Sequence, residues 1–133
     1  MCLVSQKWTV VYYEDEEGNC PALEFIDSRS VNNQAKVLAL IDLLEQQGPN
    51  LPRPYADLLT DGIHELRLKL SGDQVRLLYF FTFRHYIIMT HAFIKNVQKV
   101  PTREIKRAVE YRKEFLSRFT EEKLRRRLND EEL

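Results

Sequence analysis

Positively charged side chains recur at alternate positions of two segments that have the composition of β-strands. Arg67 and Lys69 alternate with leucines within residues 63–70, and Arg76 lies in the otherwise apolar segment 75–83. Alternate side chains of a strand point to the same face of its sheet, so these cations can share one surface. Guanidinium and ammonium groups bind phosphate oxygens, and a charge within an apolar strand is costly unless it is paired or used. The pattern predicts a surface that binds phosphates.

The register of three consecutive strands decides which of these cations meet. A two-residue turn at Gly72-Asp73 pairs Lys69 with Arg76, and a turn at Arg84-His85 places Arg76 opposite Phe93. Like charges directly opposite repel unless an anion lies between them. The alternative is an ordinary solvated face of an antiparallel sheet. The predicted charged face carries Glu65, Arg67, Lys69, Arg76, Leu78, His91, Phe93 and Lys95. The predicted core face carries Leu66, Leu68, Leu70, Val75, Leu77, Tyr79, Phe81, Ile88, Ala92 and Ile94.

Hydrophobic periodicity places helices around these strands. The predicted order is a strand at 7–13, helices at 22–28 and 31–47, strands at 63–70, 75–83 and 86–95, and a helix from 102 to about 128. Gly48 ends the second helix, and the prolines of 48–54 predict an extended connector. Glu121 and Glu122 each precede an arginine by four residues, which supports the last helix, and the tail 129–133 is expected to fray. This order predicts an α+β fold with helices packed on one antiparallel sheet.

Length and composition limit the class of protein. The chain has 133 residues, 44% of them hydrophobic, so we expect one domain over 1–133, with the part beyond about 120 an extra helix or a frayed tail. No apolar run reaches the ~18 residues of a membrane span, and the first residues lack a secretory pattern. Cys2 and Cys20 are too few for a disulfide framework, so we expect a cytoplasmic protein. The formal net charge is zero, but residues 51–100 hold seven basic and four acidic groups, which allows a local basic face.

Other motifs do not predict a catalytic or metal site. The three histidines and two cysteines lack zinc-ligand spacing, and the sequence has neither a phosphate-binding glycine loop nor a nucleophile elbow. We therefore expect no metal and no cofactor. The run Arg125-Arg126-Arg127 is typical of a solvated helix face, with contact to ribosomal RNA as the alternative.

Five blocks of the sequence, in this order, resemble one protein family. They are residues 24–28, 48–55, 61–67, 74–80 and 91–101. Over roughly residues 7–119 the chain resembles the RelE/ParE superfamily of bacterial toxins, and within it the HigB-like branch, also called phage Gp49-like. The resemblance implies a RelE-like fold and a metal-independent endoribonuclease that cuts mRNA in the ribosomal A site. It also implies a HigA-like antitoxin with a helix-turn-helix domain as partner.

The resemblance further implies which residues act on RNA. Arg67 and Arg76 match the strand arginines of the family, Lys95 matches the lysine that ends the last strand, and Lys99 matches a basic residue just beyond it. Cleavage without a metal needs a deprotonated 2′-hydroxyl, stabilisation of the phosphorane charge and a proton for the 5′-oxygen. The predicted catalytic residues are Arg67, Arg76, Lys95 and His91, and the predicted RNA-binding residues are Lys69, Phe93, Lys99 and Arg103.

The chemistry of these side chains suggests a role for each. Arg76 stabilises the transition state with help from Arg67, because guanidinium groups match phosphorane oxygens. Lys95 is a general base or an electrostatic partner. His91 has the imidazole suited to acid–base work, with a structural hydrogen-bonding role as its alternative. Lys99 and Arg103 either hold the RNA backbone or are ordinary solvated charges near the start of a helix.

Two other functions remain open for the same fold. One is a ParE-like toxin that poisons gyrase without RNA chemistry, and the other is an inactive relative that only binds an antitoxin. The cluster of Arg67, Arg76 and Lys95 favours the ribonuclease, because a gyrase-binding protein does not need it. The expected partners are therefore the ribosome, mRNA and the antitoxin, with no membrane.

Overall fold

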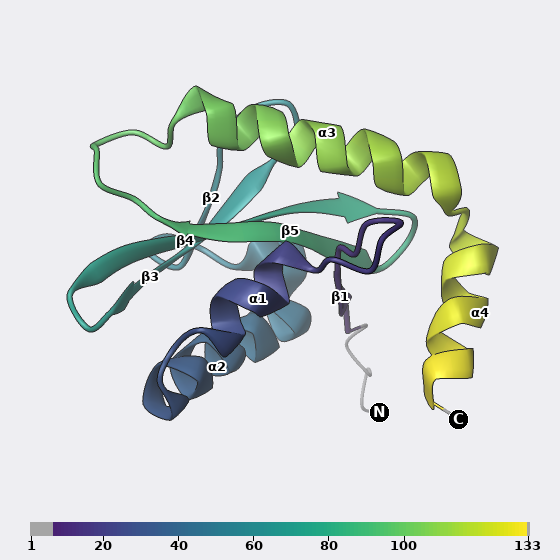
Figure 1. The fold of residues 1–133 in the computed structure, drawn as a ribbon, viewed down its shortest axis with the longest axis horizontal. Helices are drawn as coiled ribbons and strands as arrows, with labels where there is room; N and C mark the ends of the chain where they lie inside the picture. The colour runs from purple at the N-terminus through teal and green to yellow at the C-terminus, as the bar shows by residue number, and fades with distance from the viewer. Residues whose placement is uncertain (1–6, 133) are drawn as a thin grey trace, which may run out of the picture.

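A five-stranded mixed sheet lies between helices on both of its faces (Figure 1). In the computed structural model, which describes residues 7–132, the strands are β1 (Thr9–Tyr12), β2 (Ala56–Leu58), β3 (His64–Leu70), β4 (Asp73–Thr82) and β5 (Tyr86–Ile94). The helices are α1 (Pro21–Asp27), α2 (Val31–Gln47), α3 (Thr102–Arg118) and α4 (Glu121–Glu132), with a 3-10 turn at Gly48–Asn50. The strand order is β1-β5-β4-β3-β2. Cys2 lies outside the described residues.

The α+β class is confirmed, whereas the expectation of a purely antiparallel sheet is wrong. β1 pairs with β5 in parallel, with Thr9 opposite Tyr86, and the other neighbouring strands are antiparallel. The short strand β2 was not predicted; it forms at the end of the connector and pairs with β3. Three residues after a proline-rich segment carry too little alternation to reveal a strand.

The first hairpin turns at Ser71-Gly72, one position earlier than predicted. Both residues have positive φ, 51° and 91°, as a two-residue type I′ turn requires. Arg67 therefore faces Arg76, and Lys69 faces Gln74. The predicted pairing of Lys69 with Arg76 is wrong, but the pairs shift by two residues, so every side chain of β3 and β4 keeps its predicted face.

The second hairpin contains an irregularity between Leu78 and Tyr79. Arg76 lies opposite Phe93 and Leu78 opposite His91, as predicted. Beyond the irregularity Thr82 pairs with Tyr86, so residues 83–85 form the loop in place of the predicted two-residue turn. An extra residue on one strand reverses the faces that follow it. The prediction that Ile88 shares the core face with Leu77 and Tyr79 is wrong for this reason. Ile88 lies on the opposite face, in the same cluster as Phe80.

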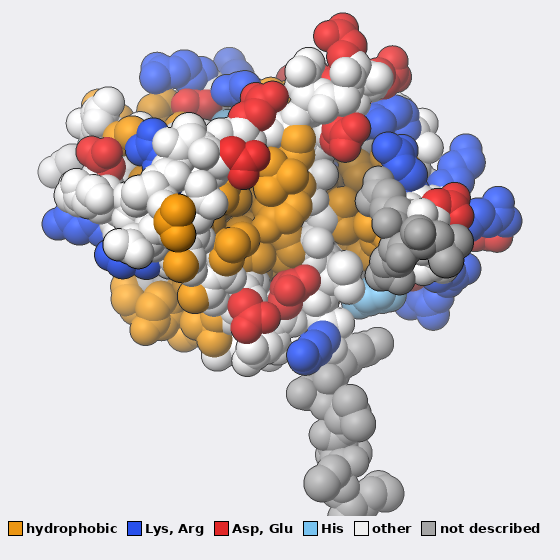
Figure 2. Space-filling view, turned by 60° about the horizontal axis from the view of Figure 1, so that its bottom comes forward, with side chains coloured by type: hydrophobic (Ala, Val, Ile, Leu, Met, Phe, Trp, Pro, Cys, Tyr) orange, Lys and Arg blue, Asp and Glu red, His pale blue; other side chains and the backbone are white. Residues whose placement is uncertain are grey.

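Each face of the sheet has its own apolar cluster. The cluster beneath α1 and α2 includes Ile26, Val37, Ile41, Leu44, Leu66, Leu77, Tyr79 and Met89. Figure 2 turns this side toward the viewer and shows hydrophobic side chains across its middle, with most Lys and Arg side chains near its borders. The cluster beneath α3 includes Leu78, Phe80, Ile88, Ala108 and Phe115. α3 thus covers part of the face that carries the predicted cations.

The helix α2 begins and ends at the predicted residues. Ser30 caps its start, because its hydroxyl accepts a hydrogen bond from the backbone N–H of Asn33 at 3.2 Å. Gly48 follows its last residue with φ of 52°. A Cβ atom at this glycine would lie 2.3 Å from Nε1 of Trp8, so two separate constraints favour glycine here.

The C-terminal segment forms two helices rather than one. Phe119 is extended and separates α3 from α4, and Leu124 of α4 is buried against the cluster beneath α3. The predicted pair Glu122–Arg126 is present at 2.5 Å, but Glu121 pairs with Arg84 at 3.1 Å instead of Arg125. α4 continues to Glu132, so the expected fraying of 129–132 is not found.

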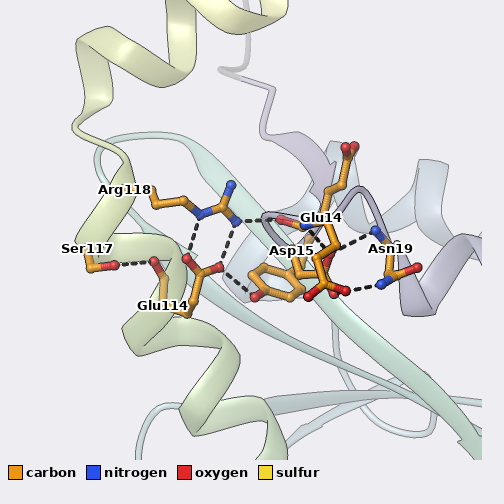
Figure 3. A network of polar contacts seen from close by, with 8 residues as sticks. Glu14, Asp15, Asn19, Glu114, Ser117 and Arg118 are labelled. Atoms are coloured by element: carbon orange, nitrogen blue, oxygen red, sulfur yellow. Dashed lines mark hydrogen bonds and ion pairs between the residues drawn. The ribbon is translucent and has the colours of Figure 1, made fainter.

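A polar network ties the last turn of α3 to the chain after β1 (Figure 3). The hydroxyl of Tyr13 donates to Glu114 at 2.6 Å, and Arg118 donates to both oxygens of the same carboxylate. Arg118 also donates to the backbone carbonyl of Glu14. Burial and the Glu114 carboxylate raise the pKa of Tyr13, so this phenol stays protonated. The network fixes α3 over the sheet.

The described residues contain no helix with the length and apolar character needed to cross a membrane.

Candidate functional site

An open hollow of about 370 Å³ lies on the α3 side of the sheet, at the β2 end. β2, β3 and β4 form its floor, and the segment between β5 and α3 forms its wall. Its apolar lining comes from Leu59, Val100 and Ile105. Its charged lining consists of Asp57, Glu65, Arg67, Arg76, Lys95 and Lys99. The structure therefore brings three of the four predicted catalytic residues together, with Lys99 beside them.

Arg76 is the most buried of these cations, with 3% of its side chain exposed. Its Nε lies 2.9 Å from Oε1 of Glu65 in an ion pair. This N–H is not directed at the carboxylate, so Nε has no hydrogen-bond partner within the described part of the chain. Nη1 donates to the backbone carbonyl of Val75 at 2.9 Å. Within residues 7–132 these contacts use Nε and Nη1 and leave Nη2 available to a ligand.

Glu65 holds the two strand arginines together. The oxygen that contacts Arg76 also lies 3.7 Å from Nε of Arg67, whose side chain is 36% exposed. Burial raises the pKa of Glu65, and the two guanidinium groups oppose this rise. Burial likewise lowers the pKa of Arg76, and the Glu65 carboxylate opposes that change. Both shifts reflect the cost of placing charges away from water, which one carboxylate does not fully offset.

The hollow carries more positive than negative charge. Lys95 follows β5, and its backbone N–H donates to the carbonyl of Gln74 at 2.7 Å. Neither its ammonium group nor that of Lys99 has an ion-pair partner among residues 7–132. Asp57 is already paired with Arg53, whose Nη2 lies 2.7 Å from Oδ2, and this hydrogen bond lowers the pKa of Asp57. An anion such as a phosphate is the ligand that this balance favours.

His91 lies on the same sheet face but does not line the hollow. It is 1% exposed and stacks on Phe93, with ring centroids 5.7 Å apart. Nε2 lies 3.2 Å from Oε1 of Glu104 on α3, and Nδ1 lies 3.0 Å from the hydroxyl of Thr90. A carboxylate can only accept, so Nε2 carries the proton of the neutral ring. The Thr90 hydroxyl beside Nδ1 donates its one proton to the backbone carbonyl of Leu78 at 3.1 Å, so Nδ1 competes with that carbonyl for it.

The surroundings of His91 also hold it neutral. Burial, with a smaller contribution from the charge of Arg107, lowers its pKa to about 4, although Glu104 opposes both effects. Each ring nitrogen lies within hydrogen-bond distance of a side chain, and the ring is not part of the lining of the hollow. The geometry therefore agrees with the structural alternative given for this histidine.

The remaining predicted residues lie around the hollow rather than in it. Lys69 is exposed on the same face, beyond the lining. Arg103 is exposed in the first turn of α3. Phe93 lies opposite Arg76 but packs into the cluster beneath α3. Of the predicted RNA-binding residues, only Lys99 lines the hollow.

Glu65 and Asp57 are lining residues that the sequence did not single out. Glu65 lies two residues before Arg67, and this spacing is the signal that placed it on the charged face. Asp57 gave no such signal, because the strand that presents it was not predicted. Over residues 7–132 no group of three or more His, Cys, Asp or Glu side chains is placed to hold a metal ion.

Comparison with known protein families identifies the chain. Residues 24–113 match the model of the phage derived protein Gp49-like (DUF891) family. The chain belongs to the Gp49-like family. This is a family of RelE/HigB-like toxins, and membership indicates the toxin of a toxin–antitoxin system. The matched range contains every charged residue of the hollow and excludes β1 and α4. A search of curated proteins finds no matching relative.

Proposed function

We propose that this Gp49-like protein is a ribosome-dependent mRNA endoribonuclease of RelE-like fold, and that the hollow is its active site. The buried guanidinium of Arg76 carries the proposal. It lies in a hollow with an excess of positive charge, and Glu65 fixes it from one side only. A fixed cation with a free donor suits the developing charge of a phosphorane.

In this mechanism the RNA supplies its own nucleophile. Lys95, which lines the hollow, takes the proton of the 2′-hydroxyl as this oxygen attacks the adjacent phosphorus and a pentavalent phosphorane forms. The bond to the 5′-oxygen of the next nucleotide then breaks, the 5′-oxygen takes a proton from the same lysine or from water, and a 2′,3′-cyclic phosphate remains. Arg76 donates to the phosphorane through Nη2, and the more exposed Arg67 neutralises a second oxygen. Lys99 attracts a flanking phosphate. Glu65 positions the two arginines.

His91 has a positioning role in this proposal. It joins β5 to α3 through Glu104, and so holds the helix whose start forms one wall of the hollow. With a pKa of about 4 and no access to the hollow, it does not serve as the acid or the base.

The proposed partners follow from the same charges. A basic hollow attracts an acidic segment, so a HigA-like antitoxin would suppress activity by covering the hollow or by blocking entry to the ribosome. The ribosome and its mRNA are the proposed targets, which places the activity in the cytoplasm.

The decisive experiment maps cleavage of an mRNA in a purified translation system. We expect wild-type protein to cut at defined positions, and Arg76→Lys and Arg67→Ala to cut far more slowly while remaining folded. Arg84→Ala is the matched control, because Arg84 is an exposed arginine in the loop after β4, away from the hollow. Cleavage by Arg76→Lys at the wild-type rate would refute the proposal. A DNA-damage response without mRNA cleavage would favour the gyrase alternative, and harmless expression would favour an inactive antitoxin-binding protein.

A further inference from the structure

A second open hollow lies across the sheet from the first, at the same β2 end. Its volume is about 240 Å³, and it is lined on the α2 side by Leu51, Arg53, Leu58, His64, Tyr79 and Phe81. Asp57 of β2 lines both hollows. The two are therefore separated at this point only by an edge strand, and neighbouring strands lie ~4.8 Å apart.

The wall of this second hollow is aromatic. The imidazole of His64 stacks on the ring of Tyr79, with centroids 5.4 Å apart and planes 20° apart. Phe81 meets His64 edge-on at 4.9 Å and Trp8 edge-on at 5.0 Å. A flat ligand ring could stack on the face of one of these rings or meet its edge in a T-shaped contact.

Two polar groups in the same wall have no hydrogen-bond partner within residues 7–132. Tyr79 is 1% exposed as a whole and its hydroxyl makes no hydrogen bond within residues 7–132, but this hydroxyl is not buried away from solvent, because it opens onto the hollow. The ring nitrogens of His64, which is half-buried, also have no hydrogen-bond partner in that range. Both groups are therefore within reach of a molecule that enters the hollow. A planar ligand with hydrogen-bonding edges would satisfy them.

The edge strand between the hollows favours a nucleic acid over an added peptide strand. β2 has three residues, and Pro52 and Pro54 precede it, so it offers few backbone groups for strand pairing. Arg53 stands at the rim with 74% of its side chain exposed. Its charge is paired with Asp57, but its exposed guanidinium plane beside aromatic rings can still stack on a base, as in proteins that bind single-stranded RNA.

We propose that the second hollow binds one nucleobase of the RNA substrate, with the RNA backbone passing around β2 from the cationic hollow. The inference rests on the proposed function, because the phosphate next to this nucleotide is the one that the first hollow holds. A volume of 240 Å³ corresponds to about eight waters at ~30 Å³ each, which suits a single base rather than a larger ligand.

The test measures binding of an uncleavable 2′-O-methyl RNA hexanucleotide and of six versions that each lack one base. Wild-type protein should bind one of the abasic versions between about five-fold and about a hundred-fold more weakly than the intact strand, as expected for loss of one stacked base. His64→Ala should bind that version and the intact strand equally. Tyr79→Phe should reduce the difference several-fold, because it removes only the hydroxyl.

Tyr86→Phe is the matched control, because Tyr86 is also buried, on the other face of the sheet, and should behave as wild type. Equal binding of all seven strands by the wild type would refute the subsite, and so would a base preference that persists in His64→Ala. If His64→Ala changes only neutralisation by the antitoxin, the hollow binds a protein and the proposal is wrong. Because no strand is cut, these outcomes are independent of whether mRNA cleavage itself is found.

Discussion

Arg76 and His91 lie on the same face of adjacent strands and are both almost fully buried, yet their surroundings differ in kind. Arg76 is paired on one side and opens onto a charged hollow. His91 is enclosed by α3, with a side chain within hydrogen-bond distance of each ring nitrogen. Strand register decides which side chains share a face, and the helix packed on that face decides which of them can reach a ligand. Substitutions at the two positions should therefore have different effects on cleavage and on stability.

The largest expected effect comes from Arg76→Ala. Loss of a fixed donor to the transition state should slow mRNA cleavage by ~10²–10³-fold. Glu65 would keep a buried charge without its nearest cation, so we also expect a loss of ~3–5 kcal/mol in unfolding free energy. Single-turnover cleavage and urea unfolding measure the two effects. Adding Glu65→Gln should restore stability without cleavage, and recovery of cleavage by that pair would contradict the assignment.

His91→Gln should reduce stability but leave the rate of mRNA cleavage almost unchanged. Removing the ring opens space beneath α3 and weakens the link to Glu104, so the unfolding free energy should fall by about 2 kcal/mol. The cleavage rate of the folded fraction should stay within about two-fold of wild type. Urea unfolding and cleavage assays well below the melting temperature check both values. A hundred-fold slower reaction in a folded variant would restore His91 to the catalytic residues.

Lowering the pH should reduce the unfolding free energy of the wild-type protein, because His91 takes up a proton more readily in the unfolded chain. The folded-state pKa of His91 is about 4, below its ordinary value of about 6.5, so the unfolded chain binds more protons between these values. The contribution of His91 is complete above about pH 6.5 and declines as the pH falls toward 4. Between pH 7 and pH 5 the expected loss is about 2 kcal/mol. Urea titrations at both pH values should show a smaller difference in His91→Gln, and an equal difference would exclude this histidine as the cause.

The smallest effect separates two exposed lysines near the hollow. Lys99 lines it and Lys69 does not, although both lie near the same arginines. Lys99→Ala should lower the slope of log affinity against log salt by ~1, as for one lost phosphate contact. Lys69→Ala should leave the slope unchanged. RNA binding measured over a range of salt concentrations gives both slopes, and equal losses would mean that the binding surface extends beyond the hollow.

The charged face could be derived from sequence because side chains alternate along a strand. Misplacing the first turn by one residue moved the pairs by two, and Arg67 and Arg76 stayed on one side. The irregularity at Leu78 and Tyr79 had no comparable signal, so Ile88 was assigned to the wrong face. The parallel pairing of β1 with β5 joins residues far apart in the chain, and no local pattern encodes it.

The two arginines of the hollow could be predicted from sequence, but the residues that bound the hollow could not. Alternation in β3 and β4 located the arginines, but the path of α3 depends on packing between distant residues such as Ala108 and Phe80. That path is what removes His91 from the hollow. The short strand β2 contributes Asp57 and separates the two hollows, and its three residues were indistinguishable from a loop.

The close approach of Gly48 to Trp8 couples the end of α2 to the aromatic wall of the second hollow. Even a methyl group at this position would displace the indole, which meets Phe81 edge-on, and Phe81 in turn contacts His64. In a saturation library selected for folding, we expect glycine alone to survive at position 48. If another residue at position 48 is tolerated because of a second substitution, we expect that substitution at Trp8, Phe81 or His64, where it can make room for the displaced indole.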